Sequence, residues 1–521
     1  MIRVPFQFKL QPYAHQLAAL EFIAERPHYA LLMEQGTGKT AVAIWDFALR
    51  YLSGALNGVL VLAPNGVQTN WVRRELPAHW PEDTACAAEA WTSGAGKRES
   101  ENIRALLQPN VDSFRILTMN WEALNTEEGY SAAFAFLRSL GAKGGILADE
   151  SQRAKNPAAQ RTKALFRLKA LAPALRAIMS GTPILKSPWD AYSQFSWLDE
   201  RILGTTSFWA FKAEYAELLP PGHGLLRHIA QRTRGKKPDP QIVAKDPITG
   251  LPRWRNLERL ERLIAPHSFR VLKRDCLDLP EKVYTQRWFA MAAKQRAAYD
   301  RLKEELRLVL EDGTILPVER LGALTKLAQV ASGYFLIPGT HTPQRLISLE
   351  VNPKIAVLME ALESCLEAGE QVIVWARFQA ELRDIAERLA ERRWAFVEYH
   401  GAIGSKTARQ EAIDAFERGE AKIFLSQPAA GGVGLTLIAA ASVAASMTVI
   451  YFSNTFNLED RVQSEDRAHR IGQQKTVRYI DILAEDSIDE AIVVSLRAKK
   501  DIAAIVTGDA RRAAEVLGLA R

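Results

Sequence analysis

A short segment near the N-terminus has the residues of a phosphate-binding loop. Positions 33–40 read Met-Glu-Gln-Gly-Thr-Gly-Lys-Thr and lie between the apolar run Tyr29–Leu32 and the helix-like run Ala41–Leu52. Glycines in such a turn let backbone N–H groups approach phosphate oxygens, and a lysine adds the cation. We therefore expect phosphate contacts from Gly36, Thr37, Gly38 and Lys39, and magnesium binding by Thr40. The alternative is a glycine-rich turn that carries a lysine by chance, because Met33 stands where the strict pattern has glycine.

An acidic pair follows another strand-like segment, Gly144–Glu150. Ligands of open parallel sheets bind at the carboxyl ends of the strands, where Asp149 and Glu150 would lie. Asp149 would hold magnesium, and Glu150 would orient and deprotonate an attacking water. The alternative is two solvated carboxylates in a loop. With the glycine-rich loop, the pair predicts an ATP and magnesium site.

Two arginines stand out near the C-terminal end, within the segment Gln463–Gln473. Arg467 and Arg470 are three residues apart, so they share a face if this segment is helical. Paired guanidiniums can stabilise charge on a transferring phosphoryl group, and both are catalytic candidates. The alternative is a surface ion-pair network with Glu465 and Asp466.

Composition sets broad limits. A chain of 521 residues is too long for one core, so two or three domains are expected. No apolar run has transmembrane length and the start lacks a signal-peptide layout, which predicts a cytoplasmic protein without membrane contact. The three cysteines have no paired metal or redox spacing. A net charge of +7 is a mild indication of a polyanionic partner.

Strand-like and helix-like segments alternate twice along the chain. Near-continuous apolar strands separated by helices are typical of parallel sheets covered on both faces. The fold class is therefore α/β, with two doubly wound lobes at 1–200 and 351–521 and a mostly helical, basic insertion at 201–350. Within the insertion, 282–336 is predicted to be mostly helical. The predicted strands are Gly58–Pro64, Phe114–Asn120, Gly144–Glu150, Leu175–Pro183, Gln371–Phe378, Phe396–His400, Ala421–Gln427, Thr448–Ser453 and Val477–Leu483.

Basic residues are concentrated between positions 222 and 274. This segment has 13 Lys or Arg against four Asp or Glu, so its excess of nine exceeds the +7 of the whole chain. Such a segment fits a surface that contacts phosphates, and the candidates are Arg232, Arg234, Lys236 and Lys237. The alternative is a solvated loop around these four residues.

The order and spacing of these pieces resemble the Swi/Snf-type ATPases of helicase superfamily two. The resemblance runs from Tyr13 to about Glu490 and is closest to the compact versions found in bacteria and their viruses. The residues that carry it are Tyr13 with His15-Gln16, the phosphate-binding loop, Ala63–Trp71, Asp149–Asn156, Ser180–Pro183, Arg270 with Lys273 before Leu279-Pro280, Val372–Phe378, Gly401 with Arg409, Gly431–Leu435 and Arg467–Gln473.

The resemblance implies two RecA-like lobes and an ATP-dependent translocase on double-stranded DNA, acting as a monomer. It implies that Gln16 contacts adenine, that Gly434 lies at the nucleotide, and that Arg467 and Arg470 complete the ATP site from the second lobe. It also implies that Arg270 and Lys273 brace the lobe junction. The residues implied to contact nucleic acid are Asn65, Asn70, Trp71, Asn120, Ser426 and Gly432.

Some features leave alternatives open. Gln152 stands where the family usually has histidine, so this position keeps hydrogen bonding but cannot titrate, and Gln16 is spaced out from Tyr13. Ser180–Pro183 would either relay the state of the phosphate site or cap a helix before a first-turn proline. Other functions consistent with these motifs are a nucleotide-gated DNA clamp or adaptor without motor work, and a helicase that separates forked DNA or RNA.

Overall fold

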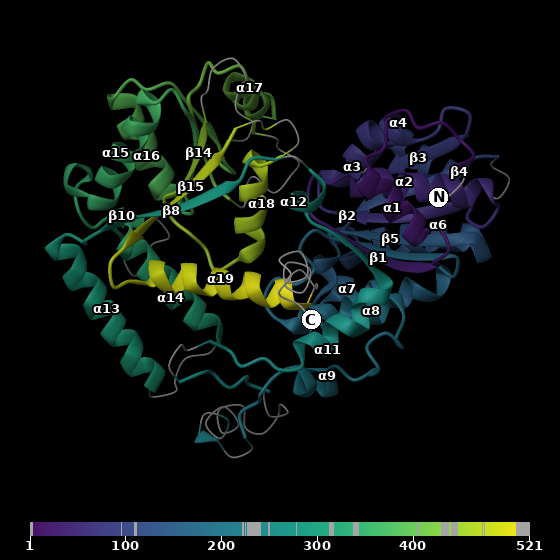
Figure 1. Ribbon diagram of the computed structural model, residues 1–521, viewed down its shortest axis with the longest axis horizontal. Helices are drawn as coiled ribbons and strands as arrows, with labels where there is room; N and C mark the ends of the chain where they lie inside the picture. The colour runs from purple at the N-terminus through teal and green to yellow at the C-terminus, as the bar shows by residue number, and fades with distance from the viewer. Residues whose placement is uncertain are drawn as a thin grey trace. The chain divides into compact units, whose positions relative to one another are not determined.

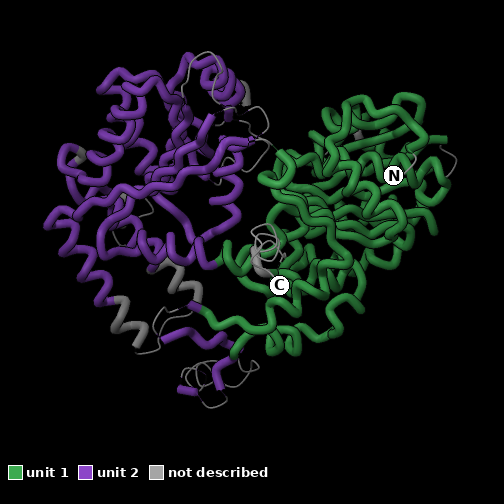
Figure 2. The backbone as a smooth tube through the Cα atoms, viewed as in Figure 1, with its two compact units in different colours: residues 1–217, 252–278, 499–521 green, residues 218–251, 279–498 purple. Residues whose placement is uncertain are grey.

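The chain divides into two compact units, which are described separately (Figure 2). Unit 1 comprises residues 1–217, 252–278 and 499–521, and unit 2 comprises 218–251 and 279–498. The predicted insertion at 201–350 is shared between the two units, and its outer boundaries stay a prediction. The structure is a computed structural model that describes residues 4–94, 96–108, 112–220, 223–224, 226, 241–247, 251–277, 279–311, 317–336, 343–403, 406–428, 437–438, 446–470, 473 and 475–506.

Unit 1 is built on a seven-stranded parallel sheet (Figure 1). The strand order is β3-β4-β2-β5-β6-β1-β7, so the strand before the phosphate-binding loop lies two places from the strand that ends in the acidic pair. Every pairing in the sheet is parallel, as the sequence predicts. The strands are β1 (His28–Met33), β2 (Gly58–Ala63), β3 (Cys86–Ala90), β4 (Phe114–Asn120), β5 (Gly144–Asp149), β6 (Leu175–Met179) and β7 (Ser268–Val271).

Helices cover both faces of this sheet because successive strand residues point to opposite sides. In β1, Leu31 packs with α1 and α2, whereas Leu32 packs with the cluster formed by α6, α7, α8 and α11. The helices of unit 1 are α1 (Ala14–Ile23), α2 (Lys39–Leu52), α3 (Val67–Asn70), α4 (Leu76–His79), α5 (Lys97–Leu106), α6 (Glu127–Leu140), α7 (Gln160–Leu168), α8 (Ala191–Leu198), α9 (Phe208–Tyr215), α11 (Leu257–Ile264) and α12 (Lys273–Cys276).

Unit 2 contains a six-stranded parallel sheet with the order β12-β13-β11-β14-β15-β8. In β11, Val372 and Ile373 pack into hydrophobic clusters on opposite faces. The strands are β8 (Lys282–Phe289), β11 (Gln371–Trp375), β12 (Phe396–Tyr399), β13 (Ile423–Ser426), β14 (Met447–Tyr451) and β15 (Val477–Ala484), with a separate antiparallel pair, β9 (Tyr334–Leu336) and β10 (Pro343–Arg345). The helices are α13 (Ala293–Glu311), α14 (Pro317–Ala331), α15 (Pro353–Glu367), α16 (Gln379–Glu391), α17 (Lys406–Glu417), α18 (Leu458–Ala468) and the first part of α19 (Ile488–Val506), whose residues from 499 on belong to unit 1.

The strand β8 corrects one prediction. The segment 282–336 was expected to be mostly helical, but its first eight residues pair in parallel with β15 at the edge of the sheet. Val283, Tyr284 and Trp288 are exposed large side chains of this strand. An edge strand that exposes apolar residues on both faces lacks the alternating pattern by which strands are recognised, and only its pairing reveals it.

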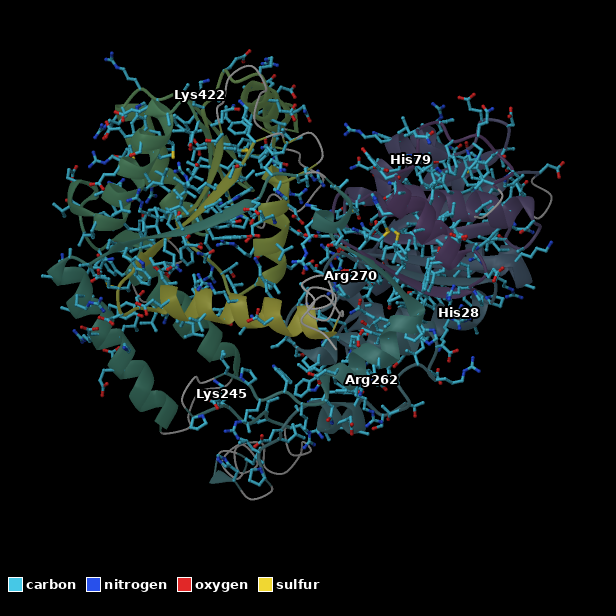
Figure 3. All side chains as sticks on the ribbon, viewed as in Figure 1. His28, His79, Lys245, Arg262, Arg270 and Lys422 are labelled. Atoms are coloured by element: carbon cyan, nitrogen blue, oxygen red, sulfur yellow. The ribbon has the colours of Figure 1, made fainter. Side chains whose placement is uncertain are left out.

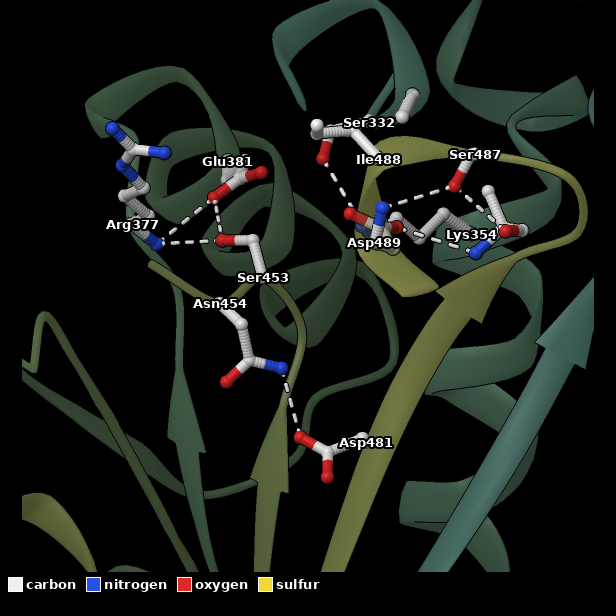
Figure 4. A network of polar contacts seen from close by, with 12 residues as sticks. Ser332, Lys354, Arg377, Glu381, Ser453, Asn454, Asp481, Ser487, Ile488 and Asp489 are labelled. Atoms are coloured by element: carbon white, nitrogen blue, oxygen red, sulfur yellow. Dashed lines mark hydrogen bonds and ion pairs between the residues drawn. The ribbon is translucent and has the colours of Figure 1, made fainter. Parts of the chain in front are cut away.

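A buried ion pair stabilises unit 2 (Figure 4). Lys354 Nζ lies 3.0 Å from Asp489 Oδ2 and 3.2 Å from the hydroxyl oxygen of Ser332, and the lysine side chain is fully buried. The contact joins the start of α15 to the start of α19. Removal of either partner would leave the other charge buried without compensation, which is destabilising.

Within the described residues, no helix is both long and apolar enough to cross a membrane.

Candidate nucleotide-binding site

The phosphate-binding loop joins β1 to α2 in unit 1. Gly36 and Gly38 have φ values of +80° and +84°, a region that favours glycine. Lys39 is the first residue of α2, and its Nζ donates to the carbonyl oxygens of Met33 at 2.8 Å and Glu34 at 3.3 Å. The loop therefore opens onto the N-terminus of a helix, where backbone N–H groups and the helix dipole favour an anion.

His15 and Gln16, in the first turn of α1, contact this loop. Gln16 Nε2 donates to the carbonyl oxygen of Thr37 at 3.4 Å, and Gln16 Oε1 accepts from the backbone N–H of Tyr13 at 2.9 Å. The ring Nε2 of His15 lies 2.9 Å from the same Thr37 oxygen. A Cβ atom at Gly38 would lie 2.0 Å from Gln16 Nε2, so a larger residue there would displace the Gln16 amide, and the φ of +84° independently favours glycine. The adenine contact of Gln16 stays a prediction.

The acidic pair lies at the carboxyl end of β5. Asp149 is buried, and burial together with the neighbouring charge of Glu150 raises the pKa of Asp149 to about 7. The positive charge of Lys39 acts in the opposite direction, which indicates that the loop lysine and this carboxylate share one site. The main-chain oxygen of Asp149 accepts a hydrogen bond of 2.8 Å from Trp121 Nε1, which fixes the strand end.

Glu150 has an unusual backbone conformation. Its φ of 51° and ψ of 54° are left-handed, which is uncommon for a residue other than glycine. Gln152 Nε2 donates to Glu150 Oε2 at 2.7 Å, and Gln152 Oε1 accepts from the hydroxyl of Ser180 at 2.6 Å. A chain of hydrogen bonds therefore runs from the predicted base to the end of β6. Ser180 accepts from the backbone N–H of Thr182 and no helix begins in the residues directly after it, so it does not cap a helix. A relay of the state of the phosphate site stays a prediction.

Hydrogen bonds connect the segment around β7 to the phosphate-binding loop and to the strand before it. Arg270, which is labelled in Figure 3, donates to the carbonyl oxygens of Leu32 at 2.8 Å and Gly181 at 3.2 Å. The backbone N–H of Lys273 donates to Glu34 Oε2 at 2.8 Å. Lys273 is buried, and its Cε would lie 3.6 Å from a Cβ atom at Gly36. Within unit 1, Lys273 thus contacts the phosphate-binding loop, and Arg270 contacts the strand before the loop and the segment after β6. The bracing of the lobe junction by these two residues stays a prediction.

Magnesium fits the donors that unit 1 offers. This ion prefers hard oxygen ligands and usually keeps several waters and substrate phosphates in its shell. Thr40, in the first turn of α2, supplies a hydroxyl, and Asp149 supplies a carboxylate. The part of the chain that the structure describes has no group of three or more His, Cys, Asp and Glu suited to a metal ion. A site with few protein ligands that is completed by a nucleotide is consistent with both observations.

The arginine segment in unit 2 differs from the expectation in its geometry. Arg467 lies on α18, but the helix ends at Ala468, so Arg470 does not continue the same helical face. Both side chains are largely withdrawn from solvent, and burial lowers the pKa of Arg470. Their roles in catalysis stay predictions.

A different arginine holds α18 in place. Arg461 Nε donates to Glu465 Oε1 at 2.8 Å, and its guanidinium also pairs with Asp481 on β15. Asn454 donates to the same Asp481 carboxylate at 2.8 Å (Figure 4). Lys282 lies 3.5 Å from Glu465. The alternative interpretation placed Glu465 in a surface ion-pair network; in the structure Glu465 is buried, and its ion pairs include Arg461 and Lys282.

Two of the predicted nucleic-acid contacts are corrected by burial. Trp71 is 1% exposed and Ser426 is 0% exposed, so neither side chain reaches solvent. Asn65 is exposed, and Asn70 and Asn120 are partly exposed. The remaining candidates, Gly432, Gly434, Arg232, Arg234, Lys236 and Lys237, lie outside the described residues.

Trp71 has a role that sequence reasoning missed. Its indole Nε1 donates to Asp149 Oδ2 at 3.1 Å, across 78 positions of the chain. No local pattern predicts a pairing between an aromatic residue after β2 and a carboxylate after β5. Only the pairing of β2 with β5 in the folded sheet reveals this contact, because side chains beyond neighbouring strand ends can meet.

The fold and the site define a class of protein: a helicase-like ATPase with two parallel-sheet lobes and a phosphate-binding loop in the first. Two family models match the chain, "SNF2-related domain" over residues 15–331 and "Helicase conserved C-terminal domain" over 353–472. The chain belongs to the SNF2-related family, which confirms the resemblance inferred from the motifs.

Individual relatives are distant. Chromodomain-helicase-DNA-binding protein 1-like of Danio rerio is 25% identical over 88% of this chain and 40% of its own length. The YwqA protein of Bacillus subtilis (strain 168) is 26% identical over 95% of this chain and 48% of its own length. The chain thus spans less than half the length of these relatives. A solved structure, the Sulfolobus solfataricus SWI2/SNF2 ATPase core in complex with dsDNA, has 22% identity and a TM-score of 0.40, and covers 98% of this chain and 96% of its own.

Proposed function

We propose that this protein is an ATP-driven translocase on double-stranded DNA. The observation that carries the proposal is the site in unit 1, where Lys39 begins α2 after the phosphate-binding loop and the buried Asp149 ends β5. Beside Asp149, the carboxylate of Glu150 accepts a hydrogen bond from Gln152. This arrangement has the parts that phosphoryl transfer from a nucleoside triphosphate requires, namely a phosphate cradle, an oxygen ligand for magnesium and a base for water.

In this proposal each residue of the site in unit 1 has a separate role in ATP hydrolysis. The backbone N–H groups of the loop and Lys39 bind the phosphates and neutralise their charge. Magnesium, when bound through Thr40 and Asp149, supplies further charge compensation at the phosphates. Glu150 orients a water and accepts its proton, and Gln152 holds the Glu150 carboxylate in place. Ser180 links this arrangement to the end of β6.

The nucleic-acid partner rests on family membership and on charge. Relatives named for DNA binding or chromatin remodelling suggest DNA as the partner. We expect double-stranded DNA to stimulate ATP hydrolysis more than single-stranded DNA or RNA does. Equal or stronger stimulation by RNA would contradict the DNA assignment. Displacement of a third strand from a DNA triplex would separate a translocase from a clamp that hydrolyses ATP without moving.

The basic segment supplies a second test of DNA binding. The proposal assigns phosphate contacts to Arg232, Arg234, Lys236 and Lys237. Neutralising all four should weaken DNA binding with little dependence on sequence, and should flatten the salt dependence by about one unit for each phosphate that the protein no longer neutralises. ATP hydrolysis without DNA should stay near normal. Unchanged affinity and salt dependence would identify the segment as a solvated loop.

Neighbouring arginines provide a matched control. Arg253 pairs with Glu217 at 3.2 Å, and Arg259 forms an ion pair with Glu214. Because acidic side chains already compensate these two cations, neutralising both should change DNA affinity less than neutralising any two of the four candidate cations does. The comparison separates binding of phosphates from a general decrease in positive charge.

A further inference from the structure

A buried hydrogen bond connects the magnesium-binding carboxylate to a segment outside the catalytic motifs. The indole N–H of Trp71 donates to Asp149 Oδ2 at 3.1 Å, where Trp71 is 1% and Asp149 is 6% exposed. Breaking this bond would remove a hydrogen-bond partner from a buried N–H group and from a buried carboxylate oxygen, and unsatisfied polar groups raise the free energy of a low-dielectric interior. The orientation of the Asp149 carboxylate is therefore tied to the position of the indole.

The segment that carries Trp71 has an unusual backbone. Trp71 begins a π-helical turn, Trp71–Glu75, directly after α3. Such turns are rare and are frequently found at functional sites. The hydroxyl of Thr118 donates to the carbonyl oxygen of Gln68 at 2.8 Å and attaches the same segment to β4.

The opposite side of this segment is accessible. Asn65 is exposed and Asn70, immediately before Trp71, is partly exposed. One short stretch of chain therefore presents amide side chains to solvent and an indole to Asp149. A ligand that displaces the stretch from outside would act on the carboxylate through one intervening side chain.

We propose that Trp71 is a positioning residue that holds the Asp149 carboxylate in its magnesium-binding orientation and couples this orientation to the position of residues 65–75. The link to nucleic acid rests on the proposed function, because Asn65 and Asn70 contact DNA only under that proposal. Coupling of this kind is reciprocal, so DNA and the magnesium–nucleotide complex should each change the affinity for the other.

Two other tryptophans in unit 1 are matched controls. Trp45 is also 1% exposed, but its Nε1 has no hydrogen-bond partner among the described residues. Trp121 donates to the main-chain oxygen of Asp149 and leaves the carboxylate untouched. Phenylalanine at any of the three positions removes one N–H and part of a buried ring, but only Trp71→Phe removes the bond to the carboxylate.

The test is a magnesium titration of the binding of a fluorescent ATP analogue, without DNA. Trp71→Phe should raise the magnesium concentration for half-maximal binding by about tenfold, the lower end for a hydrogen bond to a charged group. Trp45→Phe should stay near wild type, and Trp121→Phe, which loses only the main-chain contact of Asp149, should raise the midpoint less than Trp71→Phe does. Trp71→His, which keeps a ring N–H, should recover part of the affinity. A midpoint for Trp71→Phe equal to that of Trp45→Phe would overturn the proposal.

A second measurement uses the unmodified protein, in case Trp71→Phe does not fold. Hydrogen exchange followed by mass spectrometry should show that magnesium and nucleotide protect residues 67–75 together with 144–150. Protection of 144–150 alone would count against the coupling.

In a third arm, added DNA should shift the magnesium midpoint of wild type and Trp45→Phe but not of Trp71→Phe. An equal shift in Trp71→Phe would refute the coupling. Failure of DNA to bind wild type would refute the proposed function, while the DNA-free titration would still decide the role of Trp71.

Discussion

The hydrogen-bonded chain Glu150–Gln152–Ser180 allows the effect of one substitution to be worked out. Gln152→Ala removes the 2.7 Å bond to the Glu150 carboxylate and the 2.6 Å bond from Ser180. A hydrogen bond to a charged group contributes about 1.5–3 kcal/mol, and each 1.4 kcal/mol corresponds to about tenfold in rate. If this bond orients Glu150 in the transition state, kcat should fall by about 10- to 100-fold. KM for ATP should change little, because Gln152 lies outside the phosphate cradle.

Steady-state ATP hydrolysis at saturating ATP measures this effect, and Ser180→Ala is its matched partner. The serine bond is between neutral groups and contributes about 1 kcal/mol, so its removal should lower kcat by about fivefold. The double variant should resemble Gln152→Ala alone, since Ser180 acts on Glu150 only through Gln152. A normal kcat in Gln152→Ala would refute the reasoning, and so would additive effects in the double variant.

Residue 152 is glutamine here, whereas the family usually has histidine, so a Gln152→His variant can test by its pH dependence whether the acceptor on this residue is needed. A neutral imidazole can donate to Glu150 and accept from Ser180, but a protonated one cannot accept. Gln152→His should therefore retain activity at pH 8 and lose it, relative to wild type, as pH falls through about 6.5. Parallel pH profiles would show that the acceptor on residue 152 is not needed.

The remaining predictions concern the other catalytic candidates. Lys39→Ala should abolish ATP turnover by removing the cation on the phosphates, whereas Glu150→Gln should stop turnover and keep ATP binding; normal turnover in Glu150→Gln would exclude it as the base. Arg467→Ala and Arg470→Ala should each lower kcat by about 10³-fold or more with little change in Tm, and a collapse of Tm instead would assign them a structural role. The pKa of Asp149 is about 7 in the folded protein, above its ordinary value of 3.8. Between about pH 4 and 7 the folded protein therefore holds a proton that the unfolded chain releases, and the free energy of unfolding falls as pH rises through this range. Without magnesium, Asp149→Asn should therefore raise Tm relative to wild type at pH 8 more than at pH 5, and a constant difference would contradict the pKa shift.

The local parts of the site could be predicted from the sequence. Strand β1, the loop with Gly36 and Gly38, and α2 are contiguous, and their geometry depends on near-neighbour conformational preferences. Strand β5 with Asp149 and Glu150 is equally local, and the near-continuous apolar runs of both units indicated parallel sheets. These features depend on residue types within about one element, which is the range over which sequence patterns are informative.

Contacts between distant segments were decided only by the tertiary structure. The family resemblance suggested that Trp71 contacts nucleic acid. In the structure β2 lies beside β5, and the indole of Trp71, which follows β2 in the chain, contacts Asp149 at the end of β5. Gln152 was recognised as a departure from the family, yet its bonds to Glu150 and Ser180 depend on how the ends of β5 and β6 meet. Ser426 was expected to contact nucleic acid, but it is buried at the end of β13, an internal strand between β11 and β12. Hydrogen bonds and burial depend on which strands are neighbours, and this order is a property of the folded sheet that no single segment of the sequence encodes.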